Sequence, residues 1–332
     1  MTFTNNKVET IGLGKKPDNS LRDASLAIGG AFYASGYAES GSGAPSDLAS
    51  LPEYRFSGTT SFTDNQALAT DVDPAKAANM SALGGAVHLR QNSRATFDSV
   101  GFRRNHASSS GTARGGAVAI DFDTDYVLYS ANLAFTGSIF EENQALGSQF
   151  AQGGTVYLPF GFHSLTGARL DGNAALASAA TEAAEGGAVY FKSIANDPNP
   201  NNPTKTLTIA GTDFENNKAE ATAAGGVARG GAIYHDGSEA GSTATLELTN
   251  TSFTGNQAGT FGGAVYAAGG TVKLIGNGSA TSTYSGNTAG AGSAYGGITL
   301  AASSQLNFNV AAFGSETVTG LTLETASAVL IV

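Results

Sequence analysis

Acidic residues at every second position of one short segment are the first candidates for chemistry. The segment reads DFDTDY and places Asp121, Asp123 and Asp125 two residues apart. In an extended strand these three carboxylates would face the same way and could hold a hard cation such as Ca²⁺. The segment has neither the next glycine nor the later glutamate of a calcium-binding loop. We therefore favour a solvated strand edge and keep the triplet as a weak Ca²⁺ candidate, with no other metal site and no cofactor expected.

The other titratable residues show no catalytic or metal-binding spacing. Glu141 and Glu142 are neighbours, so their side chains should point to opposite sides of a strand. No pair of histidines has the spacing of metal ligands on one element. His88 is the fifth residue of the segment GGAVH, whereas His235 is the sixth residue of GGAIYH. Because the two positions differ by one, the side chains should face opposite sides of the strand. We expect all four histidines on the surface, at His88, His106, His163 and His235.

The composition excludes several classes of protein. Of 332 residues, 45 are glycine, and only 13% are charged, about half the usual share of ~25%. The 17 basic and 27 acidic residues give a net charge of −10, which argues against nucleic acid or an anionic membrane as a partner. There is no cysteine, hence no disulfide, and no apolar run long enough to insert into a membrane. This composition is typical of extracellular β-repeat proteins.

Two short signatures alternate along the whole chain. The aromatic positions from 62 to 284 give six intervals over 222 residues, an average of 37. Such a period indicates a repeat architecture. The F-x-x-N signature lies at Phe62 and Asn65, Phe102 and Asn105, Phe140 and Asn143, Phe214 and Asn217, and Phe253 and Asn256, with further copies from Phe3, Leu170 and Tyr284. The G-G-A signature begins at Gly84 and Gly85, Gly115 and Gly116, Gly186 and Gly187, Gly230 and Gly231, and Gly262 and Gly263, with variants from Gly29, Gly153 and Gly296.

Short strands recur inside each repeat. The segments TLTI, TLEL and TVKL alternate polar and apolar residues, as half-buried strands do. Three such strands per repeat, joined by Gly, Asn and Ser turns, predict an all-β parallel β-helix of about eight or nine coils. Coils stacked about 4.8 Å apart would form a rod roughly 40 Å long.

Stacking explains the two signatures as determinants of the fold. Equivalent phenylalanines would form an interior stack, and equivalent asparagines a ladder of amides bonded from coil to coil. Asparagine also tolerates the left-handed conformation, which suits a corner where a strand ends. The paired glycines would allow a turn with positive φ and close packing without a Cβ. The positions between the signatures then face outward, as we expect for Lys218, Glu220, His235 and Asp236.

The alternation of F-x-x-N and G-G-A-[ILV] from Phe3 to Thr299 resembles the passenger domains of chlamydial polymorphic membrane proteins, a family of autotransporter adhesins. The resemblance implies a right-handed parallel β-helix on the bacterial outer surface that attaches to host cells. In that family the two motifs together are associated with adhesion, which carries over to the motif positions given above.

We therefore read residues 1–332 as one β-helix passenger fragment of a longer polypeptide, with residues 300–332 as the last coil and an edge or cap. The expected function is non-enzymatic adhesion at the cell surface, or after secretion, to a host-cell protein or glycan, with self-association through open sheet edges. One alternative is a β-helical carbohydrate-active enzyme or tailspike, which would need carboxylates gathered on one flank, such as Asp171 with the aspartate triplet. The other is a structural spacer of a larger autotransporter.

Overall fold

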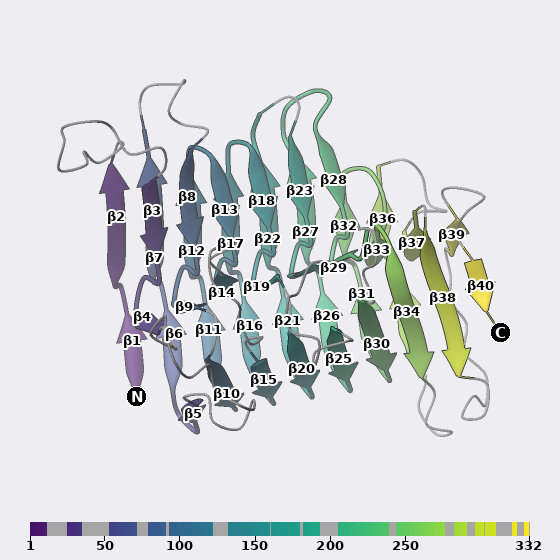
Figure 1. The fold of residues 1–332 in the computed structure, drawn as a ribbon, viewed down its shortest axis with the longest axis horizontal. Coiled ribbons are helices and arrows are strands. Elements are labelled where there is room, and N and C mark those ends of the chain that lie inside the picture. The colour runs from purple at the N-terminus through teal and green to yellow at the C-terminus, as the bar shows by residue number, and fades with distance from the viewer. Residues whose placement is uncertain are drawn as a thin grey trace, which may run out of the picture.

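The computed structural model describes most of the chain as short strands, without a helix among the described residues. These are residues 1–11, 25–34, 53–71, 79–90, 93–121, 132–159, 161–179, 182–192, 205–238, 244–275, 282–290, 296–301, 303–309, 321–323 and 329–331. Within them no helix is long and apolar enough to cross a membrane. Every strand pairs in parallel with the equivalent strand of the next coil, so the prediction of a parallel β-helix is confirmed (Figure 1). The right-handed winding stays a prediction.

Five sheets run along the rod, where three strands per coil were expected. One coil contains β10 (Arg94–Asp98), β11 (Gly101–Arg103), β12 (His106–Ser109), β13 (Thr112–Arg114) and β14 (Val118–Asp121). We number sheets 1 to 5 in this order. The prediction of three strands was wrong because tight turns at Ser99 and Arg104, both with positive φ, divide what reads as one extended stretch. The predicted eight or nine coils agree with sheets of up to nine strands.

Sheets 1, 2 and 5 enclose the main lobe. Sheet 1 contains β5 (Glu53–Ser57), β10, β15 (Asn132–Thr136), β20 (Phe162–Thr166), β25 (Thr206–Ala210), β30 (Thr245–Thr249), β34 (Gly270–Ile275), β38 (Ser304–Asn309) and β40 (Val329–Ile331). Sheet 2 contains β1 (Thr2–Thr4), β6 (Ser61–Thr63), β11, β16 (Ile139–Glu141), β21 (Arg169–Asp171), β26 (Asp213–Glu215), β31 (Ser252–Thr254) and β35 (Thr283–Ser285). Sheet 5 contains β4 (Phe32–Ala34), β9 (Val87–Arg90), β14, β19 (Val156–Leu158), β24 (Val189–Lys192), β29 (Ile233–Asp236), β33 (Val265–Ala267), β37 (Ile298–Leu300) and β39 (Thr322–Leu323).

Sheets 3 and 4 form a second, thinner lobe. Sheet 3 contains β2 (Lys7–Ile11), β7 (Gln66–Thr70), β12, β17 (Gln144–Gly147), β22 (Ala174–Ala177), β27 (Lys218–Ala221), β32 (Gln257–Ala258) and β36 (Thr288–Ala289). Sheet 4 contains β3 (Ser25–Ile28), β8 (Met80–Leu83), β13, β18 (Phe150–Gln152), β23 (Ala183–Glu185) and β28 (Val227–Arg229).

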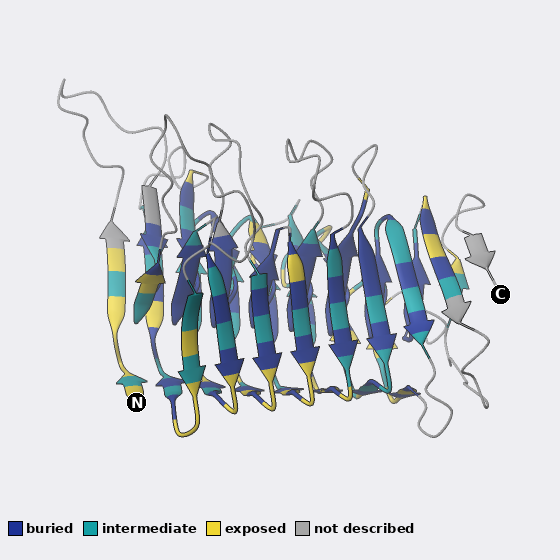
Figure 2. Ribbon diagram, turned by 60° about the horizontal axis from the view of Figure 1, so that its bottom comes forward, coloured by how far each residue is buried: buried dark blue, intermediate teal, exposed yellow. Residues whose placement is uncertain are grey.

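The two lobes differ in the size of the side chains that fill them. The main lobe is packed with Phe, Leu, Val and Ile, whereas alanine methyl groups fill almost all of the second lobe, which we call the alanine lobe. Alternating buried and less buried residues along the strands show which side faces each core (Figure 2). Because alanine side chains are small, sheets 3 and 4 lie close together, and the second lobe is thinner than the main lobe.

The chain narrows to a waist between the lobes, and the two signatures lie opposite each other there. Gly115 has a φ of 61°, and a Cβ on Gly116 would overlap both the carbonyl oxygen of Gly154 and the backbone of Gln144. Gln144 directly follows Asn143, the asparagine of the next coil's F-x-x-N. The same contacts recur at Gly85, Gly154, Gly187 and Gly231. The expected turn and close packing at the paired glycines are thus confirmed, and the contact explains why one signature always accompanies the other.

The asparagines form an unbroken ladder of eight residues along the waist. Asn143 donates through Nδ2 to Oδ1 of Asn173 (3.0 Å) and to the carbonyl oxygen of Phe102 (3.0 Å). The Oδ1 atom of Asn143 accepts two hydrogen bonds from Asn105, one from the backbone N–H (3.0 Å) and one from Nδ2 (2.9 Å). All four hydrogen-bonding positions of the buried amide are therefore used. The ladder joins Asn6, Asn65, Asn105, Asn143, Asn173, Asn217, Asn256 and Asn287.

The corner itself differs from the expectation. The residue in the left-handed conformation is the one before the asparagine, as at Asp64 (φ 56°) and Arg104 (φ 49°), while the asparagine is buried. Three other coils place glycine at this position, at Gly172, Gly255 and Gly286. The asparagine cannot itself be the corner because its amide must point along the axis to the next rung.

The expected phenylalanine stack is present but interrupted. Phe62 lies 5.0 Å from Phe102, which lies 4.9 Å from Phe140, with the ring planes nearly parallel. Leu170 takes the position in the next coil, so the stack stops there. Sheet 1 adds a second stack, with Phe97 and Phe135 4.9 Å apart, which meets the first edge-on. Edge-to-face contacts between parallel stacks fix how sheets 1 and 2 pack.

Replacing Asn143 by alanine should destabilise the fold by about 3–5 kcal/mol, because it leaves donors of Asn105 and the carbonyl of Phe102 buried without partners. The measurement is the free energy of unfolding from denaturant titration followed by circular dichroism. Asn6→Ala is the matched control, since Asn6 is exposed at the end of the ladder and its backbone N–H keeps its bond to Asn65 (3.1 Å). Equal losses in both variants would contradict a cooperative ladder.

Candidate functional site

The motif residues proposed for adhesion are buried and build the fold. Phe62, Phe102, Phe140, Phe214 and Phe253 have no exposed surface, and neither do their partner asparagines. Contacts with another molecule must therefore come from the side chains that point outward around them. On sheet 2 these are the residue before the aromatic position and the two residues after it.

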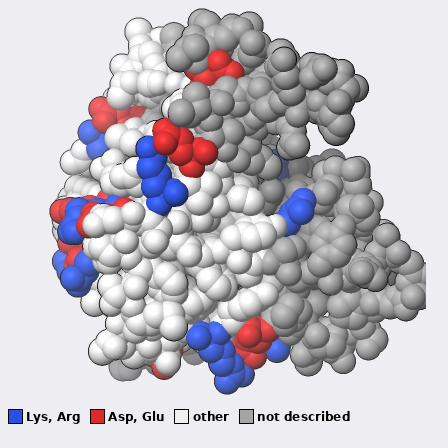
Figure 3. Space-filling model, turned by 90° about the vertical axis from the view of Figure 1, so that its left-hand side faces the viewer, with Lys and Arg blue, Asp and Glu red and all other residues white. Residues whose placement is uncertain are grey.

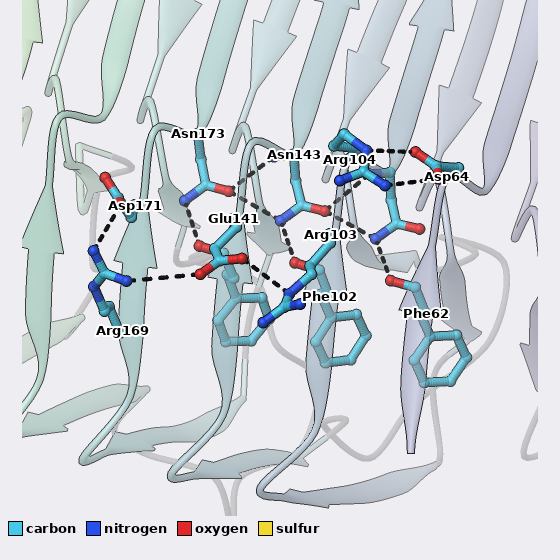
Figure 4. A network of polar contacts seen from close by, with 12 residues as sticks. Phe62, Asp64, Phe102, Arg103, Arg104, Glu141, Asn143, Arg169, Asp171 and Asn173 are labelled. Atoms are coloured by element: carbon cyan, nitrogen blue, oxygen red, sulfur yellow. Dashed lines mark hydrogen bonds and ion pairs between the residues drawn. The ribbon is translucent and has the colours of Figure 1, made fainter. Parts of the chain in front are cut away.

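Charged side chains concentrate at these outward positions in the middle of sheet 2. Figure 4 shows most of this group lying over the asparagine ladder. Viewed along the axis, Lys, Arg, Asp and Glu side chains gather at the left edge of the molecule, and further charged groups lie on the end face and at the lower edge (Figure 3). We call the group the charged strip; it consists of Asp64, Arg103, Arg104, Glu141, Glu142, Arg169, Asp171, Asp213 and Glu215.

Ion pairs between coils connect most of the charged strip. Arg104 holds Asp64 through two hydrogen bonds of 2.8 and 2.9 Å, which lower the pKa of the Asp64 carboxyl. Arg103 Nε lies 2.9 Å from Glu141. Each such exposed pair contributes only about 0–1 kcal/mol. The network therefore orders the surface more than it stabilises the rod.

Arg169 is the centre of the network. Its Nη2 lies 2.7 Å from Asp171 and 2.8 Å from Glu215, and its Nη1 lies 3.6 Å from Glu141. The hydrogen bond to Glu215 and the surrounding carboxylates raise the pKa of Arg169. The prediction that Glu141 and Glu142 point to opposite sides of a strand was wrong, since both face outward and line one hollow. The strand ends at Glu141 and the chain turns at Glu142, which has a φ of 55°. Of the two, Glu141 joins the ion pairs of this network.

A hollow of about 310 Å³ opens in the strip beside Gly172. Glu142, which precedes it by one coil, is left-handed (φ 55°), and its Cγ would lie 3.7 Å from a Cβ on Gly172. A left-handed residue with a long side chain costs roughly 1–2 kcal/mol relative to glycine. The sequence therefore places charge here where sister coils use glycine. The hollow is lined by Arg103, Arg104, Glu141, Glu142, Asp171 and Gly172.

A second polar cluster lies where the outer faces of sheets 4 and 5 meet, and we call it the tyrosine seam. Four tyrosines stack at about coil spacing, with Tyr157 and Tyr190 5.2 Å apart. Sequence reasoning missed the seam, although tyrosine recurs at a fixed place after G-G-A. The seam consists of Tyr157, Tyr190, Tyr234 and Tyr266 on sheet 5, with Arg114, Gln152, Glu185 and Arg229 on sheet 4.

Polar contacts link the sheet 4 side of the seam. Gln152 accepts a hydrogen bond from Arg114 (2.9 Å) and donates one to Glu185 (3.0 Å). Arg229 lies 3.8 Å from Glu185 and its guanidinium lies 5.3 Å from the ring centre of Tyr266. Burial raises the pKa of Glu185. These contacts, all within the chain, make the seam a structural joint between the lobes.

The prediction of surface histidines was wrong for three of the four. His88, His163 and His235 are buried, and only His106 is partly exposed. His235 points into the main lobe and stacks on Phe191 at 5.4 Å, whereas His88 lies on the outer face and stacks on Tyr33. Their opposite directions agree with the offset argument. Asp236, expected outward, is on the outer face but buried in contact with Tyr190 (3.2 Å).

The Ca²⁺ candidate lies mostly outside the described residues. Asp121 ends β14, but its side chain is not described, and Asp123 and Asp125 fall beyond it. Asp171, the fourth carboxylate of the enzymatic alternative, is held by Arg169 and by Asn216 (3.1 Å). No three His, Asp or Glu side chains in the described ranges are grouped to hold a metal ion. The triplet therefore stays an untested prediction.

The buried histidines make stability depend on pH. Burial lowers the pKa of His235 to about 4 and that of His88 to about 3, while the unfolded side chains take up protons near pH 6.5. The unfolded state thus gains protons first, and stability is lost as pH falls from about 6.5 towards 4, by about 2 kcal/mol per histidine at pH 5. Thermal unfolding between pH 7.5 and 5 measures the loss. His235→Phe should remove its share, whereas the partly exposed His106→Gln should change the profile less; an unchanged profile in His235→Phe contradicts the assignment.

One protein-family model matches the chain. The model of the Chlamydia polymorphic membrane protein repeat matches residues 250–268, which contain the F-x-x-N signature at Phe253 and the G-G-A signature at Gly262. No curated protein and no solved structure matches the sequence. Residues 250–268 therefore carry a chlamydial polymorphic membrane protein repeat, which supports the resemblance that the two alternating signatures indicated.

Proposed function

We propose that this chain is a non-enzymatic, adhesin-like passenger displayed on a bacterial surface, which attaches to a host-cell protein or glycan through the flanks of its β-helix. The repeat at residues 250–268 supports the surface location, since it is named for a family of membrane proteins. The fold supports the mode of action, since a stacked rod presents long flat flanks.

The observation that carries the proposal is the division between repeated and variable residues. The repeated Phe and Asn side chains and the paired glycines lie in the cores and at the waist, where they cannot reach a partner. The outward position after the aromatic residue instead changes from coil to coil, from Thr63 to Arg103, Glu141, Asp171 and Glu215. Several weak contacts along such a flank would add up to firm attachment.

The contacts of the carboxylates make the enzymatic alternative less favourable than binding. Glycoside hydrolysis needs an acid with a raised pKa and a second, free carboxylate nearby. On the flank, Asp171 and Glu215 are both held by Arg169. Burial raises the pKa of Glu185, but this carboxyl is bonded to Gln152 and close to Arg229 in the tyrosine seam. We therefore favour binding over catalysis.

Beads coated with residues 1–332 should attach to cultured epithelial cells several-fold more than beads coated with albumin. Attachment is counted by microscopy or flow cytometry. The control for dependence on the fold is the Asn143→Ala variant on the same beads. It is used at a temperature at which the variant is unfolded. Attachment no better than albumin would contradict the proposal, and binding by the full-length protein alone would support the spacer alternative. Release of sugars from the cell surface would support the enzyme.

A further inference from the structure

We propose that the charged strip is a docking surface for a cationic segment of a partner protein, a segment that presents lysine or arginine side chains. This inference rests on the proposed function and names the flank and the partner chemistry that it leaves open. The strip contains six acidic and three basic residues, so its net charge is 3 − 6 = −3.

The pairing within the strip leaves only negative charge available. All three arginines are engaged, Arg103 with Glu141, Arg104 with Asp64, and Arg169 with three carboxylates. In the described part of the chain, Glu142 and Asp213 have no lysine or arginine within ion-pairing distance. Glu142 contributes to the raised pKa of Arg104, after the larger contribution of Asp64. An anionic partner would have to break existing ion pairs to reach an arginine, whereas a cationic one finds two carboxylates outside the ion pairs.

The hollow beside Gly172 gives a cationic side chain a place to enter. Gly172 and Glu142 both line this space of about 310 Å³, and a Cβ on Gly172 would lie 3.7 Å from Glu142 Cγ. Its charged lining consists of Arg103 and Arg104 with Glu141, Glu142 and Asp171. Arg103, Arg104, Glu141 and Asp171 all belong to ion pairs. Glu142 is therefore the carboxylate of the lining that a Lys or Arg head group in this hollow would meet.

The second free carboxylate sets the extent of the surface. Asp213 begins β26, two coils beyond Glu142, which follows β16, so the two are separated by roughly 10 Å along the axis. Asp213 is in register with Ile139, three residues before Glu142, so the two carboxylates are also offset by roughly 10 Å along the strands. Residues in an extended segment are about 3.3 Å apart, so basic residues about four positions apart span the combined separation of roughly 14 Å. The strands β16, β21 and β26 are neighbours in sheet 2, so such a segment would run across them, along the axis.

The test uses a fluorescein-labelled octapeptide of alternating arginine and serine, with a glutamine–serine octapeptide as the uncharged probe. Binding to the full chain is followed by fluorescence anisotropy at 50 and 150 mM salt. We expect the arginine peptide to bind and the glutamine peptide not to bind. Binding of the arginine peptide should be weaker at 150 mM salt than at 50 mM. The double variant Glu142→Gln with Asp213→Asn should raise Kd at least five-fold, while circular dichroism and the unfolding midpoint show that the fold is intact.

The matched control removes the same two charges elsewhere, with Asp98→Asn on sheet 1 and Glu220→Gln on sheet 3. Its Kd should change less than two-fold. Equal weakening in both double variants would show attraction by net charge alone, and no weakening in either would place the peptide elsewhere; either result overturns the inference. Cell attachment by the unaltered chain tests the proposed function separately. If the strip variant binds the peptide normally while the unaltered chain still attaches to cells, this inference fails and the proposed function stands.

Discussion

The fold depends on one steric constraint, the contact of backbone with backbone at the waist. There the paired glycines of one coil press against the residue that follows the asparagine of the next coil, with no side chain between them. Alanine at Gly116 would overlap both a carbonyl oxygen and a neighbouring chain segment. The contact brings two distant parts of each repeat together and divides the cross-section into two lobes.

The asparagine ladder supplies hydrogen-bond partners for the polar groups enclosed at the waist. Backbone groups enclosed at the waist would be costly without partners. Each amide donates to the next amide and to a carbonyl of the preceding coil, that of the phenylalanine or, for Asn217, of Leu170. The amides are thus satisfied from Asn65 to Asn256. The ladder also fixes the register, because a slip of one residue would move an asparagine out of line and every outward side chain inward.

Satisfying the interior with so few residue types leaves the surface free to vary. The left-handed corner before each asparagine projects its side chain outward, and there the chain uses Asp64, Arg104 and Glu142 in three successive coils. Strain is retained at Arg104 and Glu142 where glycine would relieve it. The buried His88 and His235 add a different property, a fold that loosens in acid, since neutral imidazoles are enclosed among apolar rings.

The amino-acid sequence by itself determined the class of fold and the roles of its signatures. The period of the F-x-x-N and G-G-A motifs implied stacked coils, and equivalent residues in stacked coils must meet, so the ladder at Asn143 and the stack at Phe102 could be predicted. Only the tertiary structure decided the five strands per coil, the alanine lobe, the burial of His235 and the pairing of Arg169 with three carboxylates. These depend on the path of the turns and on neighbours in adjacent coils. The partners of Asn143 are 30 to 41 positions away along the chain, and Glu215, which bonds Arg169, is 46 positions away. A local pattern carries no information about such contacts, because it specifies which way a residue alternates but not what lies opposite it.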